Sequence, residues 1–167
     1  CSIRGDLIQA LHKQVNHPSA PEYLVIETSG VSNPGEVVQT MMLPQLASRI
    51  RLDSVVAIVD SEQFTELYDQ NWYVAGSQVA VADMIILNKV DLVDEKRLVE
   101  LRGLMQDEFL SKAPIFETTH AQVPLELLLN VGRYDIERLV NREPVEVHLH
   151  PRHDHGDADH DHDHDDH

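Results

Sequence analysis

Cysteine is nearly absent from the sequence, and the single residue, Cys1, excludes an internal disulfide framework. Uninterrupted apolar runs of about 18 residues, the length that a membrane-spanning helix needs, are also missing. The first residues do not follow the basic, apolar and small-residue order of a signal peptide. Neither a membrane partner nor secretion is indicated, and a cytoplasmic location is expected.

Basic residues are scarce as well. The chain has 13 Lys and Arg against 29 Asp and Glu, which gives a formal net charge of −16. Nucleic-acid binding depends on clustered Lys and Arg, so it is not expected as the main function. An acidic protein attracts cations or basic partners instead. The length of 167 residues and the apolar content of 42% fit one globular domain with an appendage.

Short apolar segments alternate with segments of helical spacing along the chain. The sequence predicts buried strands over 24–26, 53–60, 83–91 and 114–119. It predicts helices over 6–15, 34–50, from 61 onward, 75–82, 94–109, 125–129 and 136–140. Continuous apolar strands that alternate with helices are typical of an α/β fold, a parallel sheet with helices on both faces.

A polar stretch, "NKVD", directly follows the apolar run "MIIL". The carboxylate of Asp91 could accept two hydrogen bonds from N1 and N2 of guanine, a pair of donors that adenine lacks. The stem of Lys89 could lie along the purine face, and the amide of Asn88 could tie the loop to its neighbours. The alternative interpretation is an ordinary polar loop between a strand and a helix.

Another acid, Glu27 in "VIETSG", stands at the end of the first apolar run. In open parallel sheets, ligands bind at the carboxyl ends of the strands, where Glu27, Asp60 and the "NKVD" loop are expected. A carboxylate there could hold Mg²⁺, and Gly30 could bring its N–H near a γ-phosphate. The alternative is a strand end that simply faces solvent.

In this order, "CSIRGDL", "ETSGVSNP", "VVAIVD", "QVAVADMIILNKVDL" and a His-rich stretch resemble the CobW-type P-loop GTPases, the CobW/HypB/UreG group. The resemblance covers Cys1 to about Arg142. It implies a P-loop NTPase fold that binds GTP or GDP with Mg²⁺ and hydrolyses GTP. Glu27 would position Mg²⁺ or the attacking water, Gly30 would sense the γ-phosphate, and Asn88, Lys89 and Asp91 would select guanine.

The same resemblance implies a metallochaperone that delivers a transition metal to a client metalloprotein. Zinc is the favoured cargo, and cobalt for cobalamin synthesis is the alternative within the family. The family's phosphate-binding motif GxxGxGK[ST] is absent, and only the last cysteine of its CxCC motif is present, as Cys1. The chain is therefore expected to be a fragment that lacks its first strand, and not to hydrolyse GTP efficiently alone.

Two parts are expected, a GTPase domain over 1–142 and a metal-binding tail or linker over 143–167. The tail alternates histidine with aspartate, a pattern that suits weak binding of Zn²⁺, Co²⁺ or Ni²⁺, and it is expected to be disordered without metal. An expression tag or a merely solvated acidic tail are the alternatives. The predicted metal ligands are Cys1, Glu27, His148, His150, His153, His155, His160, His162, His164 and His167.

Two other functions stay open. The chain could buffer or store metal through its tail without nucleotide chemistry, or its acidic surface could dock a basic client. His120, at the end of a predicted strand, could support the base pocket, although a solvated side chain is the plainer interpretation. The sequence leaves the oligomeric state open, a homo-oligomer included.

Overall fold

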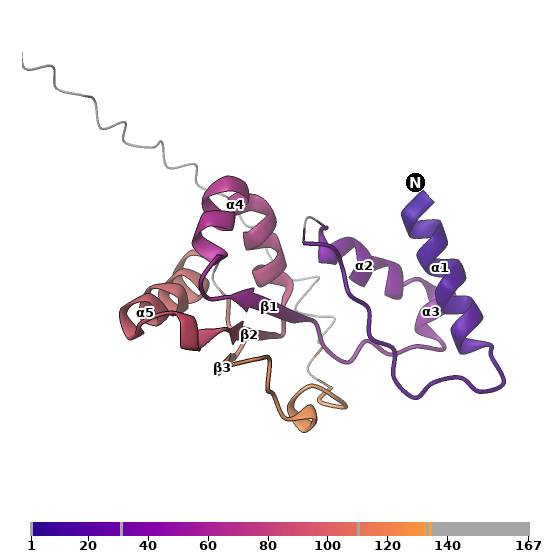
Figure 1. Cartoon of the computed structure of the whole chain (residues 1–167). Coiled ribbons are helices and arrows are strands. Elements are labelled where there is room, and N and C mark those ends of the chain that lie inside the picture. The colour runs from indigo at the N-terminus through magenta and orange to yellow at the C-terminus, as the bar shows by residue number, and fades with distance from the viewer. Residues whose placement is uncertain (1, 31, 110, 133, 135–167) are drawn as a thin grey trace, which may run out of the picture.

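The structure, a computed structural model, describes residues 2–30, 32–109, 111–132 and 134 (Figure 1). Its strands β1 (Val56–Asp60), β2 (Met84–Asn88) and β3 (Ile115–Thr118) form a parallel sheet in the order β1-β2-β3. The predicted α/β class with a parallel sheet is confirmed.

Strand register brings three polar residues together at one edge of the sheet. Asp60 pairs with Asn88, and Asn88 pairs with Thr118, so the three residues form a row at the carboxyl ends of the strands. The central strand β2 has an apolar sequence because Met84 to Leu87 are all buried.

The main core lies between the sheet and the elements α4 (Phe64–Val81), α5 (Glu95–Gly103) and the π-helix η2 (Leu104–Glu108). Its buried residues are Val59, Phe64, Val79, Ala82, Ile85, Leu87, Leu98, Leu101, Met105 and Phe109. The rings of Phe64 and Phe109 meet edge to face with centroids 6.4 Å apart. This aromatic pair joins the start of α4 to the residue that follows η2.

One continuous helix, α4, replaces the two helices predicted from residue 61 and over 75–82. Gly76 lies inside this helix, and a Cβ added to it would lie 2.9 Å from Cε1 of Phe109. The glycine therefore lets the helix approach the aromatic ring closely. In this part of the chain glycine does not interrupt the helix, because its packing against Phe109 compensates for its low helix propensity.

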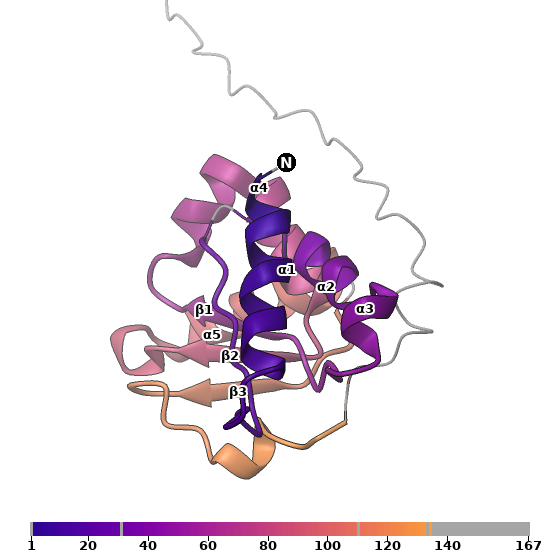
Figure 2. The ribbon, with the colours of Figure 1, turned by 90° about the vertical axis from the view of Figure 1, so that its right-hand side faces the viewer.

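A second, smaller core joins α1 (Ser2–Val15), α2 (Pro34–Met41) and α3 (Pro44–Ala47), which lie together in Figure 2. It contains the buried side chains of Leu11, Met41 and Leu46. Because α2 also contacts α4, the two cores belong to one structure.

The single helix predicted over 34–50 is wrong: α2 ends at Met41, and α3 begins at Pro44. Proline has no N–H to donate and disfavours a helical residue before it, and Leu43 is indeed extended, with ψ of 135°. Asn33 caps α2 by accepting a hydrogen bond from the Gly35 N–H at 2.9 Å.

The strand predicted over 24–26 is also wrong. Residues 23–28 make no backbone hydrogen bond to another described residue, and Val25 is 89% exposed. Apolar, β-prone residues become a strand only when a neighbouring strand accepts and donates their ladder hydrogen bonds. Leu24 packs instead at the margin of the smaller core.

The remaining predictions have mixed outcomes. The helix at 6–15 is confirmed within α1, and the helix at 94–109 appears as α5 followed by η2. A 3-10 turn, η3 (Leu125–Leu127), replaces the helix at 125–129. The segments 136–140 and 143–167 lie outside the described residues. In the described part of the chain, no helix combines the length and apolar character needed to cross a bilayer.

After η3 the chain returns to the amino end of β1. The carboxylate of Asp53 accepts hydrogen bonds from the N–H groups of Val131 at 3.2 Å and Gly132 at 2.8 Å. The N–H of Tyr134 donates to the Asp53 carbonyl at 3.0 Å. The last described residue therefore lies at the sheet edge opposite the row of Asp60, Asn88 and Thr118.

Gly76→Ala is expected to lower the free energy of unfolding by about 1–3 kcal/mol, because the new methyl group overlaps the Phe109 ring. The measurement is urea denaturation followed by circular dichroism. Gly103→Ala is the matched control: its methyl group meets only Asp107 Oδ2, at 3.8 Å, and should stabilise α5 by about 0.5–1 kcal/mol. Equal effects of the two substitutions would show that the contact with Phe109 is not the constraint.

Candidate functional site

Asn88 is the centre of the polar row. Its side-chain Oδ1 accepts hydrogen bonds from Oγ1 of Thr118 at 3.1 Å and from the N–H of Ala121 at 2.8 Å. These bonds attach the end of β2 to the end of β3 and to the loop that follows. Asparagine suits this position because one amide oxygen has two lone pairs and can accept both donors.

The backbone of Asn88 makes the matching connection to β1. Its carbonyl oxygen accepts hydrogen bonds from Oγ of Ser61 at 2.6 Å and from the N–H of Ser61 at 3.0 Å. Ser61 is fully buried, so water does not compete for these bonds. Sequence reasoning missed Ser61 and Thr118 as site residues, because a lone hydroxyl residue at a strand end carries no pattern that distinguishes it from a solvated one.

Lys89 turns its side chain toward β1. Its Nζ lies 2.7 Å from Oδ2 of Asp60, and its backbone is left-handed, with φ of 62°. The other carboxylate oxygen of Asp60 accepts the N–H groups of Glu62 at 3.0 Å and Gln63 at 3.2 Å. Asp60, which the sequence placed at this edge without a role, therefore positions Lys89.

This ion pair shifts both pKa values. Burial by itself raises the pKa of the Asp60 carboxyl, but hydrogen bonds from Lys89 and from the two backbone N–H groups outweigh it, and the pKa lies below its usual value. The hydrogen bond to Asp60, together with the attraction between the charges, raises the pKa of Lys89. Both groups stay charged at neutral pH.

Asp91 differs from its neighbours because it is not used internally. It lies exposed in the 3-10 turn η1 (Val90–Leu92), and it makes no hydrogen bond or ion pair with any other described residue. The loop thus carries an amide and an ammonium group that are fixed by the protein and a carboxylate that is available to a ligand.

The loop after β3 makes a tight turn beside Asn88. His120 and Ala121 both have positive φ, 53° and 51°, and the N–H of Gln122 donates to the carbonyl of Thr119 at 3.2 Å. The Ala121 N–H that this turn presents is the one that Asn88 accepts. The imidazole of His120 is exposed, and a supporting role for it stays a prediction.

The "ETSG" segment is attached to the domain through α4. The side-chain amide of Gln78 donates to the carbonyl oxygens of Gly30 at 2.9 Å and Ser32 at 3.2 Å. Glu27 is exposed and makes no hydrogen bond or ion pair with another described residue. A lone carboxylate fits Mg²⁺, because that ion keeps several waters and completes its shell with substrate phosphates. Sequence reasoning missed Gln78, a polar residue in a helix without a motif.

The predicted transition-metal ligands cannot be compared with the fold. Cys1 and the eight histidines of the tail lie outside the described residues. Within the described ranges, no group of three or more His, Cys, Asp or Glu is close enough to hold a metal ion. The assignments of these ligands, and of Glu27 and Gly30, stay predictions.

Comparison with known proteins adds three findings. The family model described as CobW/HypB/UreG, nucleotide-binding domain, matches residues 1–117. The zinc-regulated GTPase metalloprotein activator 1 of Schizosaccharomyces pombe is 30% identical over 146 residues, which cover 86% of this chain and 35% of the relative. The zinc chaperone YjiA of Escherichia coli is 35% identical over 118 residues, which cover 70% of this chain and 36% of the relative.

A solved structure has a similar fold. The crystal structure of Zn(II)-bound YjiA GTPase from E. coli superposes with a TM-score of 0.61 at 33% sequence identity, and the match covers 78% of this chain and 39% of the other. The chain thus spans less than two-fifths of the length of each of these proteins.

Asn88→Ala is expected to lower the free energy of unfolding by about 1–3 kcal/mol, because the Thr118 hydroxyl and the Ala121 N–H lose their shared acceptor. Asn88→Asp retains an acceptor oxygen at the same place and should lose less than half as much. Urea denaturation of the three proteins measures the difference. Equal losses in the two variants would mean that the shared acceptor is not what holds the row together.

Proposed function

The chain belongs to the CobW/HypB/UreG family through its nucleotide-binding domain, and from this premise we propose that it acts as a GTP-dependent metallochaperone. It binds GTP at the carboxyl edge of the sheet, and GTP hydrolysis controls the delivery of zinc to a client metalloprotein. The names of the related proteins, a zinc chaperone and a zinc-regulated activator, support zinc over cobalt as the cargo.

One observation carries the nucleotide part of this proposal: Asp91 is an exposed carboxylate on a loop whose first two residues, Asn88 and Lys89, are fixed by neighbouring elements. Asn88 holds the start of the loop through its bonds to Thr118 and Ala121, and Asp60 holds Lys89. A fixed carboxylate that accepts two hydrogen bonds from N1 and N2 of guanine discriminates against adenine, which would leave it unpaired.

The other residues have supporting roles. The Lys89–Asp60 pair aligns the lysine stem so that a purine can stack against it. Glu27 positions Mg²⁺ or the attacking water, and Gly30, held by Gln78, offers a backbone N–H to the γ-phosphate. The bound Mg²⁺ would supply charge to stabilise the phosphoryl transition state.

Hydrolysis by this chain alone is expected to be inefficient, because its 167 residues contain no GxxGxGK[ST] motif to cradle the phosphates. Guanine selection is a separate property and can be tested without that motif. We place the activity in the cytoplasm, and we expect metal binding to involve Cys1 and the histidine tail. The alternative cargo is cobalt for cobalamin synthesis.

GTP, but not ATP, is expected to shift the amide NMR signals of residues 88–92 and 121 when it is titrated into the ¹⁵N-labelled chain. Asp91→Asn should weaken this response to GTP at least tenfold and create a response to XTP, because an amide can donate to the O2 carbonyl of xanthine. Asp107→Asn, the same change on η2, should leave the GTP response unchanged. Equal shifts with GTP and ATP in the unmodified chain would exclude guanine selection by this loop.

Metal buffering without nucleotide chemistry is the second candidate function. The observation that favours it is the composition of residues 148–167, which hold eight of the eleven histidines and seven aspartates. Neutral imidazoles bind zinc, cobalt and nickel, and neighbouring carboxylates raise the local cation concentration. The two functions differ in one respect. Only a metallochaperone requires that bound GTP change the affinity of the chain for zinc.

Zinc competition against a chromophoric chelator separates the two candidates. If the metallochaperone proposal holds, GTP with Mg²⁺ should change the zinc affinity of the full chain about fivefold or more, within the usual range of coupling between sites. Asp91→Asn at the same nucleotide concentration is the control, because it corrects for zinc bound by the nucleotide itself. Identical zinc curves with and without GTP, and loss of binding when the eight tail histidines are replaced by asparagine, would favour buffering.

A further inference from the structure

Helix α4 connects the two loops that the proposed function assigns to the nucleotide. Just before the helix begins, the hydroxyl and the N–H of Ser61 donate to the carbonyl of Asn88 at 2.6 Å and 3.0 Å. Near the other end of the helix, the side-chain amide of Gln78 donates to the carbonyls of Gly30 and Ser32. The part of α4 between these two connections is about 20 Å long, at a rise of about 1.5 Å per residue. One helix therefore sets the distance between the two loops.

Gln78 makes the only hydrogen bonds that attach residues 23–30 and 32 to another part of the described chain, at 2.9 Å and 3.2 Å. The other hydrogen bonds of this segment are internal. The N–H of Ser32 donates to the carbonyl of Ser29 at 2.9 Å, and their hydroxyl oxygens lie 2.8 Å apart. These internal bonds shape the turn, but they do not fix its position relative to the sheet.

The position requires a side chain with two donors. Both acceptors are backbone carbonyl oxygens, so only the NH₂ end of the amide can serve them, and its two N–H groups can supply one hydrogen bond each. Glutamate in the same place could only accept. Methionine has a similar length and no charge, but it offers no donor. Gln78 is half-buried, so water competes less for these bonds than it would at an exposed site.

We infer that Gln78 is a positioning residue for the contact between Gly30 and the γ-phosphate. The inference rests on the proposed function and adds to it a residue that lies in none of its motifs. Glycine is the residue with the greatest backbone freedom, so a Gly30 without this attachment would have to be ordered when the phosphate binds, at a cost in affinity. The guanine contact should not need Gln78, because Asn88 and Asp60 hold that loop.

The test compares GTP and GDP, each with Mg²⁺, because the two nucleotides differ only in the γ-phosphate. Amide NMR shifts of residues 88–92 in the ¹⁵N-labelled full chain measure both affinities. The unmodified chain should bind GTP more tightly than GDP. Gln78→Met should weaken GTP binding by about fivefold or more and change GDP binding less than twofold, because only the γ-phosphate contact is lost. A merely structural role would weaken both.

A second measurement needs no nucleotide. In the free Gln78→Met chain, the ¹H–¹⁵N nuclear Overhauser effects of the Gly30 and Ser32 amides should fall, because the segment has lost its attachment to α4. The values for residues 84–92 should not change. Circular dichroism confirms that the variant folds.

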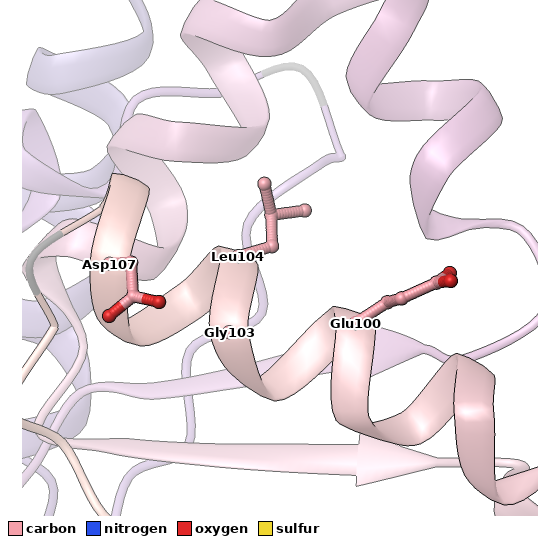
Figure 3. Close-up of a pocket in the computed structure, with 4 residues that line it drawn as sticks. All are labelled: Glu100, Gly103, Leu104 and Asp107. Carbon is pink, nitrogen blue, oxygen red and sulfur yellow. The ribbon is translucent and has the colours of Figure 1, made fainter.

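Gln106→Met is the matched control. Gln106 is an exposed residue of η2, and its side chain makes no hydrogen bond with another described residue. Figure 3 shows this helical segment with the residues that line a shallow surface pocket, Glu100, Gly103, Leu104 and Asp107. No described hydrogen bond or ion pair joins these four residues to either loop. The control should leave both nucleotide affinities and the Gly30 signal unchanged.

The outcomes separate the inference from the proposed function. An unchanged affinity of Gln78→Met for GTP, an equal loss for GTP and GDP, or an unchanged Gly30 signal would each overturn the inference and leave guanine selection intact. An equal effect of Gln106→Met would overturn it too. If residues 88–92 of the unmodified chain respond to neither nucleotide, the proposed function fails, and the inference fails with it.

Discussion

The hydrogen bonds of Asn88 connect the ends of all three strands, and the candidate site depends on this connection. Its side-chain oxygen holds Thr118 and the turn at Ala121, and its carbonyl oxygen holds Ser61 after β1. Two of these partners are buried, so the bonds form where water does not compete. Because parallel strands end at the same edge, a single residue at the end of the central strand can fix both neighbouring loops.

At the carboxyl ends of the strands, some polar groups hold the loop in place and others are available to bind a ligand. Asp60 and Lys89 neutralise each other at 2.7 Å, and the side-chain oxygen of Asn88 accepts two hydrogen bonds. Asp91, one turn further, keeps its carboxylate exposed. Preorganisation of this kind lowers the entropy lost when a base binds, because the backbone that carries the carboxylate is already ordered.

Sequence pattern predicted the parallel sheet well but failed where a segment needed a partner. The strands β1, β2 and β3 were predicted from their continuous apolar runs, although only β2 is buried along its length and Ile58 in β1 is 67% exposed. The segment 24–26 has the same composition, yet it forms no ladder in the described structure, because β-propensity describes a fit to neighbours rather than a property of the segment. The helix over 34–50 failed for a local reason, the proline at position 44, whereas Gly76 was tolerated because the Phe109 ring packs against it.

The sequence by itself determined the α/β class, the position of "NKVD" at a strand end and the acidic, histidine-rich composition, because hydrophobic period, turn residues and charge are local properties. Only the tertiary structure decided that Asp60, Asn88 and Thr118 share one row, that Gln78 holds the loop at Gly30, and that Gly76 packs against the Phe109 ring. These features join residues that are up to 58 positions apart, as Asp60 and Thr118 are, or depend on helix packing. Strand register and the approach of helices decide such contacts, and neither can be read from the spacing of residues along the chain.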